Sequence, residues 1–83
     1  MQNIDKAQQY QNAVLAQLNA EIAAKDQTPK SVAAALEIDY NTFRRYLKGE
    51  RAIPMTILWA TLETLELAED VFVTRARQRF QQQ

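Results

Sequence analysis

TPKSVAAALEIDYNTFRRYLKG, residues 28–49, is the stretch of this chain that decides its predicted fold. Thr28 is a favoured N-cap residue and the proline after it has a φ already set for a first helical turn, so a helix is predicted over residues 29–36. Asp39 can cap a second helix over residues 40–48, and the glycine that follows can end it by adopting a positive φ. The stretch therefore predicts two short helices joined by a tight turn.

The second predicted helix has two unlike faces. Its apolar side is formed by Phe43, Tyr46 and Leu47. Polar side chains recur at spacings of three and four and project together from the other side, namely Asn41, Arg44, Arg45 and Lys48. Arginine and lysine can donate to guanine or phosphate, and asparagine can bond adenine, so this face matches the DNA major groove. The alternative interpretation is an ordinary solvated helix face.

These two helices resemble the helix-turn-helix of the phage Cro and lambda-type repressor family. The residues that look like the family's buried positions are Val32, Ala33, Leu36, Ile38, Phe43 and Tyr46. The following segment LKGERAIP, residues 47–54, is similar to the family's loop into its next helix. The match covers roughly residues 10–67. Glu37 departs from the pattern, because the family usually has glycine there, in a turn that often needs φ > 0, and a glutamate would cost on the order of 1 kcal/mol.

The remainder of the chain also reads as helical. A long amphipathic helix is predicted over residues 5–25, with Ala7, Tyr10, Val14, Leu18 and Ile22 as its apolar stripe and Leu15 beside it. Pro54 opens a helix over residues 54–65, with Met55, Leu58, Leu62 and Leu65 as its buried stripe. A last helix is predicted over residues 69–81. The fold class is therefore all-α, a compact bundle of about five helices in one domain over residues 1–83.

Composition excludes several functions. The chain of 83 residues has no cysteine and no histidine, which argues against disulfides, a zinc or iron site and the commonest general base. No glycine-rich phosphate loop is present, and Ser31 has no histidine to activate it. We expect no enzyme, no metal, no cofactor and no small-molecule ligand. No apolar run reaches membrane-spanning length and no signal peptide is visible, so the expected location is the cytoplasm.

The net charge is zero, but the charges are unevenly distributed. Residues 40–51 hold four cations and one anion, whereas residues 63–70 hold four anions and no cation. The distribution predicts a positive end that can engage phosphates and a negative end that can orient the domain.

The predicted function is that of a transcriptional regulator that binds double-stranded DNA in a sequence-specific way. The family resemblance implies a phage-type repressor that acts by occupying its operator. Base-reading roles fall to Tyr40, Asn41, Arg44 and Arg45. DNA-backbone roles fall to Thr28, Lys30, Lys48 and Arg51. Tyr40 packing on the turn is an equally weighted alternative. The runner-up function is a protein-interaction module, antitoxin-like or antirepressor-like, that grips a protein partner.

The C-terminal helix carries an apolar stripe, formed by Phe72, Val73, Ala76 and Phe80. Two interpretations are open: the stripe packs on the chain's own core, or it is the interface of a homodimer. A small module binds DNA weakly by itself, so a homodimer reading two half-sites roughly 34 Å apart is expected.

Overall fold

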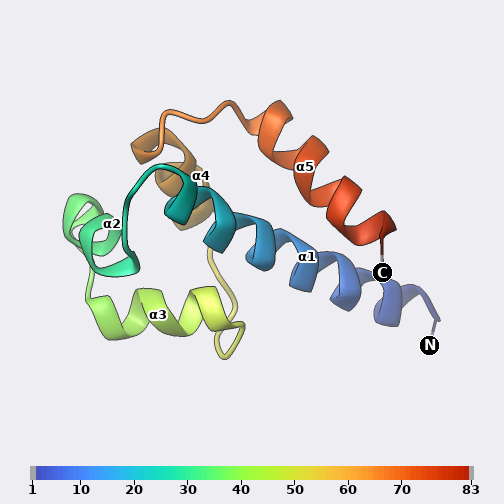
Figure 1. Ribbon diagram of the computed structural model, residues 1–83. Helices are drawn as coiled ribbons and strands as arrows, with labels where there is room; N and C mark the ends of the chain where they lie inside the picture. The colour runs from blue at the N-terminus through green and yellow to red at the C-terminus, as the bar shows by residue number, and fades with distance from the viewer. Residues whose placement is uncertain (1, 83) are drawn as a thin grey trace.

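Five α-helices make up the part of the chain that the computed structural model describes, residues 2–82 (Figure 1). Their bounds are Gln2–Ala24 (α1), Pro29–Leu36 (α2), Tyr40–Lys48 (α3), Met55–Thr64 (α4) and Glu69–Gln81 (α5). No strand occurs among these residues. The all-α fold class and the five helices are confirmed. The first helix begins three residues earlier than predicted, and Pro54 precedes α4 as its N-cap.

Local signals set the ends of α2 and α3. Thr28 and Ser31 form a capping box, in which each side-chain hydroxyl accepts from the other residue's backbone N–H, at 3.0 and 2.9 Å. Asp39 caps α3 by accepting the backbone N–H of Thr42 at 3.0 Å. Gly49 ends α3 with a φ of 77°. The predicted bounds of both helices are confirmed, and the capping residues that predicted them are the ones that end the helices.

The turn between α2 and α3 is tight and left-handed at its first residue. Glu37 has φ 58° and ψ 40°, and its N–H and that of Ile38 bond the last carbonyls of α2. The turn thus keeps the geometry that favours glycine although a glutamate occupies it. Asp26 and Glu66, which follow α1 and α4, also have positive φ. The chain thus follows three helices with acidic residues in the left-handed region, which costs on the order of 1 kcal/mol for each glutamate and less for aspartate.

One hydrophobic core joins all five helices. Its fully buried side chains include Leu18 and Ile22 of α1, Val32 of α2 and Phe43 of α3. Leu58, Leu62 and Leu65 close it from α4 and its C-cap. The two predicted turn helices therefore rest on α1 and α4 and present their other sides outward.

The C-terminal helix packs on its own chain. Phe72 and Ala76 are only 1% and 0% exposed, and α5 lies along α1, with Phe80 against Tyr10 at a ring separation of 5.5 Å (Figure 1). This corrects the predicted dimer interface for Phe72 and Ala76, because a side chain buried in its own core cannot contact a second copy. Val73 remains exposed.

Two predicted core positions lie at the surface instead. Met55 is 63% exposed, because it begins α4 and no element covers its first turn. Ala7 is exposed as well, in the first part of α1. In residues 2–82 no helix is both long and apolar enough to cross a membrane.

Candidate nucleic-acid interface

The outer face of α3 is open to solvent. Tyr40, Asn41, Arg45 and Lys48 are exposed, and Arg44 is half-buried. Beneath them Phe43 and Leu47 are buried in the core. In Figure 1 α3 forms the lower edge of the molecule, with no other helix below it. The amphipathic pattern of residues 40–48 therefore divides the helix as predicted, and the four proposed base readers share one accessible helix.

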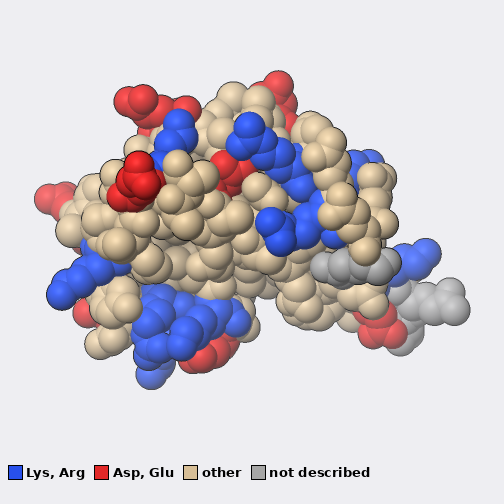
Figure 2. Space-filling view, viewed as in Figure 1, with Lys and Arg blue, Asp and Glu red and all other residues tan. Residues whose placement is uncertain are grey.

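The cations of this region have no acidic partner within the described residues. Residues 2–82 contain one ion pair, between Arg75 and Glu21, so none of the cations near α3 is neutralised in this way. Figure 2 shows Lys and Arg side chains gathered over the lower surface, where α3 lies. Acidic side chains at Glu37, Asp39 and Glu50 stand nearby in the sequence and are exposed. The patch is positive, but less so than a count over residues 40–51 alone suggests.

The proposed backbone-contacting residues come from three places in the fold. Thr28 and Lys30 stand at the start of α2, Lys48 in the last turn of α3, and Arg51 in the loop before α4, and all four are exposed. The hydroxyl oxygen of Thr28 already accepts from Ser31. It can still donate its own proton to an acceptor such as a phosphate oxygen. Thr28 therefore serves as a cap whatever else it does.

Sequence reasoning missed the residue that ties α3 to α1. The side-chain amide of Asn19 donates to the carbonyl of Leu47 at 3.1 Å and to the carbonyl of Leu15 at 2.8 Å. It thus satisfies a carbonyl in the last turn of α3, which has no partner within its own helix. The Leu15 side chain also lies close to Gly49, which ends α3. In the sequence Asn19 looked like one more polar residue on the outside of a helix.

A second missed feature is a buried carboxylate beneath α5. Glu21 is 4% exposed, and both its oxygens accept from the Arg75 guanidinium at 2.9 Å. Gln17 also donates to it, at 2.8 Å, and itself accepts from Arg79 at 3.1 Å. Burial alone would raise the pKa of Glu21, but the hydrogen bonds from Arg75 and Gln17, with the nearby positive charges, outweigh burial and lower that pKa.

Comparisons with protein-family models, curated proteins and solved structures found no match to this chain. The described residues also hold no group of three or more metal-binding side chains.

Proposed function

We propose that this chain binds double-stranded DNA in a sequence-specific way, by placing α3 in the major groove. The observation that carries the proposal is the outer face of α3, which is exposed, cationic and free of ion pairs within the described residues. The buried side chains beneath it and the Asn19 bonds to its last turn hold this face rigidly. A rigid helix can aim donors at base edges without losing much conformational entropy on binding.

The proposed base readers are the side chains nearest the middle and start of α3. Arg44 and Arg45 can donate two hydrogen bonds to the O6 and N7 atoms of guanine, and Asn41 can pair with adenine in the same way. Tyr40, exposed at the first position, can pack on a thymine methyl group or a sugar. Arg44 is half-buried, so part of its side chain already packs against the protein while its guanidinium is proposed to read a base.

The proposed phosphate contacts flank these readers. Lys48 and Arg51 follow them along the chain, and Thr28 and Lys30 stand at the N-terminus of α2, where the helix dipole favours an anion. Such contacts set affinity and orientation rather than sequence preference.

The proposed biological role is that of a transcriptional regulator that works by occupying an operator in the cytoplasm. A single α3 covers a short half-site, so the working form is a homodimer that reads two half-sites roughly 34 Å apart. The resemblance to phage Cro and lambda-type repressors supports this role.

The first experiment selects binding sites from a pool of randomised duplexes at low ionic strength. Arg44→Ala and Arg45→Ala are then measured on the selected site, where each should lose about 1–3 kcal/mol and relax specificity at one base pair. Lys48→Ala should weaken binding equally for every sequence and make the salt dependence shallower. Lys6→Ala, an exposed cation at the other end of α1, is the matched control and should change nothing. Failure of the pure protein to bind any duplex would exclude the proposal.

The second candidate is a protein-interaction module of the antitoxin or antirepressor kind. It is favoured by the exposed anions Glu63, Glu66, Glu69 and Asp70 and by an apolar groove described below. Salt separates the two candidates. About four to six phosphate contacts per subunit give a log–log slope near −0.9 per contact, whereas a largely apolar protein interface is nearly insensitive to salt.

A further inference from the structure

An apolar groove of about 450 Å³ opens on a face of the molecule to which α3 contributes no residue. Three segments form its walls: the first half of α1, the loop leading into α4 with the start of α4, and the first turn of α5. Most of the lining is apolar, including Tyr10, Val14, Ile53, Leu58 and Phe72.

Three large apolar side chains line this groove and stand open to water. Met55 is 63% exposed, and Trp59 and Val73 are each 42% exposed. Single exposed apolar residues are ordinary, but several around one hollow make a contiguous patch of the kind that marks an interaction site. One surface of the molecule thus combines a hollow with exposed apolar side chains that can enter a matching hollow.

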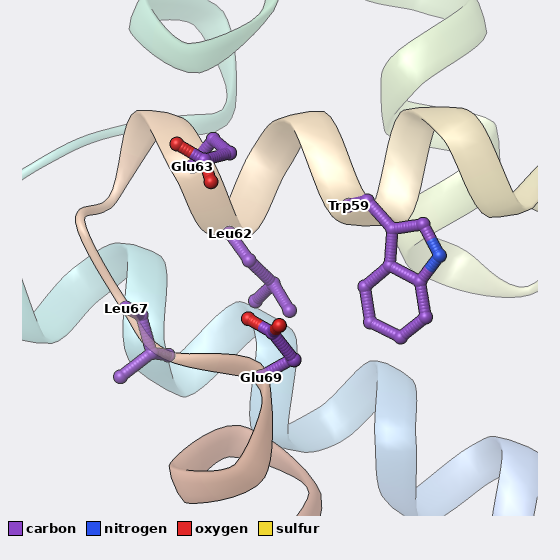
Figure 3. Close-up of a pocket in the computed structure, with 5 residues that line it drawn as sticks. All are labelled: Trp59, Leu62, Glu63, Leu67 and Glu69. Atoms are coloured by element: carbon purple, nitrogen blue, oxygen red, sulfur yellow. The ribbon is translucent and has the colours of Figure 1, made fainter.

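Trp59 also lines a second, smaller hollow of about 220 Å³, together with two leucines and the acidic residues Glu63 and Glu69. Figure 3 shows the Trp59 indole on one side of it, Leu62 and the Glu69 carboxylate between, and Glu63 and Leu67 farther along. Glu69 therefore lies beside the apolar patch, at the N-terminus of α5, where its charge is also favoured by the helix dipole.

The outer side of α5 next to the groove carries a regular order of charge. Glu69, Val73 and Arg77 follow one another at four-residue spacing, so they share one helix face, and all three are exposed. The acid and the base lie about 6 Å on either side of the valine along the helix axis. This order is its own complement: when two such helices meet antiparallel at their valines, each glutamate faces the other copy's arginine.

We propose that a second copy of this chain docks on this groove, across a two-fold axis that passes near Val73. Met55, Trp59 and Val73 of both copies are covered, and Glu69 of each copy pairs with Arg77 of the other. The inference rests on the homodimer of the proposed function and names the surface that forms it. The chain has no net charge, so two copies approach without overall repulsion.

The pattern favours a second copy over a foreign partner. A two-fold contact requires one patch that complements itself, and the acid–valine–base order meets that requirement without any other protein. No α3 residue lines the groove. A contact made there therefore uses none of the proposed base-reading side chains.

The test is sedimentation equilibrium of the full chain over a series from micromolar to millimolar concentration. Val73→Lys should weaken the dimer by roughly tenfold or more, because it places an unpaired charge at the centre of the contact. Val71→Lys is the matched control. This second valine of α5 is 37% exposed but points about 200° away from Val73, so its substitution should leave the dimer unchanged. Circular dichroism checks that each variant folds.

Charge reversal separates self-pairing from any other contact. Glu69→Arg and Arg77→Glu should each weaken the dimer by roughly tenfold, since each creates two like-charge pairs across the axis. The double variant Glu69→Arg/Arg77→Glu restores both pairs and should return to the wild-type dissociation constant. A wild-type chain that stays monomeric at millimolar concentration overturns the proposal, as does equal loss in the two valine variants or a double variant no better than the single ones.

DNA binding is scored separately. Val73→Lys should still bind a single half-site at low salt, because α3 is untouched. If the chain dimerises but binds no duplex, the proposed function is wrong and the proposed interface is supported. If the chain stays monomeric but binds half-sites, the proposed interface is wrong and the proposed function is supported.

Discussion

Helices α3 and α5 both carry arginines, yet the fold uses them differently. In α5, Arg75 donates to the buried carboxylate of Glu21 and Arg79 donates to Gln17. In α3, Arg44 and Arg45 make no ion pair within residues 2–82. The same residue type is therefore structural in one helix and available to a ligand in the other.

The difference comes from the element that each helix meets. α5 lies along α1, where Gln17 and Glu21 offer acceptors at the contact. α3 meets α1 at the Asn19 amide and at buried apolar side chains, and none of the α3 cations makes an ion pair within residues 2–82. A count of charges by residue type cannot distinguish these cases, whereas the packing does.

The largest expected effect tests the difference between the two helices directly, by removing one arginine from each. Arg75→Met leaves Glu21 buried without its main partner and should lower the free energy of unfolding by about 1–3 kcal/mol. Arg45→Met, on the exposed side of α3, should stay within about 0.5 kcal/mol of wild type. Urea denaturation monitored by circular dichroism measures both. Equal losses would mean that the two arginines do not differ in role.

Lowering the pH should weaken the same contact between Glu21 and Arg75. The pKa of Glu21 is lowered in the folded chain, so its contribution to stability is fully present above the ordinary carboxyl pKa of about 4.3 and is lost as the pH falls through the folded-state value. Glu21→Gln should therefore show a flatter loss of stability between neutral and acid pH than wild type. Thermal unfolding across that range, with Glu50→Gln as an exposed control, supplies the measurement. A control that flattens the profile as much as Glu21→Gln would contradict the assignment.

The smallest expected effect concerns the turn between α2 and α3. Glu37→Gly relieves the left-handed strain at the turn and should raise the free energy of unfolding by about 1 kcal/mol. It also removes an acidic neighbour of the α3 cations, so duplex affinity at low salt should rise with it. Ala35→Gly, inside α2, should instead lower stability by roughly 1 kcal/mol. Melting curves of the two variants should move in opposite directions.

The sequence predicted the α2–α3 unit closely because its signals are local. The ends of both helices depend on Thr28, Asp39 and Gly49, and each acts within a few residues of itself. The accessible face of α3 followed from helical spacing alone. The family resemblance left two outcomes open at Glu37, a different turn or a strained glutamate, and the structure has the strained glutamate, with φ 58°.

Long-range contacts were the part that the sequence concealed. The stripe on α5 suited the chain's own core and a partner equally well, and the structure divides it: Phe72 and Ala76 are buried in the core, whereas Val73 stays exposed. Glu21 and Arg75 are 54 residues apart, so no periodicity connects them. Met55 has the spacing of a buried residue but stands where α4 has no neighbour to cover it.

The contact between α1 and α5 also affects how the chain is made. Helix α1 is synthesised before α5 but depends on it for its cover, since Phe72, Ala76 and Arg75 reach it only after the intervening helices exist. During translation the side of α1 that α5 will cover stays exposed to water, and the carboxylate of Glu21 stays hydrated rather than buried. The core can therefore close only after residues near 76 have been synthesised, and until then the nascent chain exposes apolar surface that the folded chain buries.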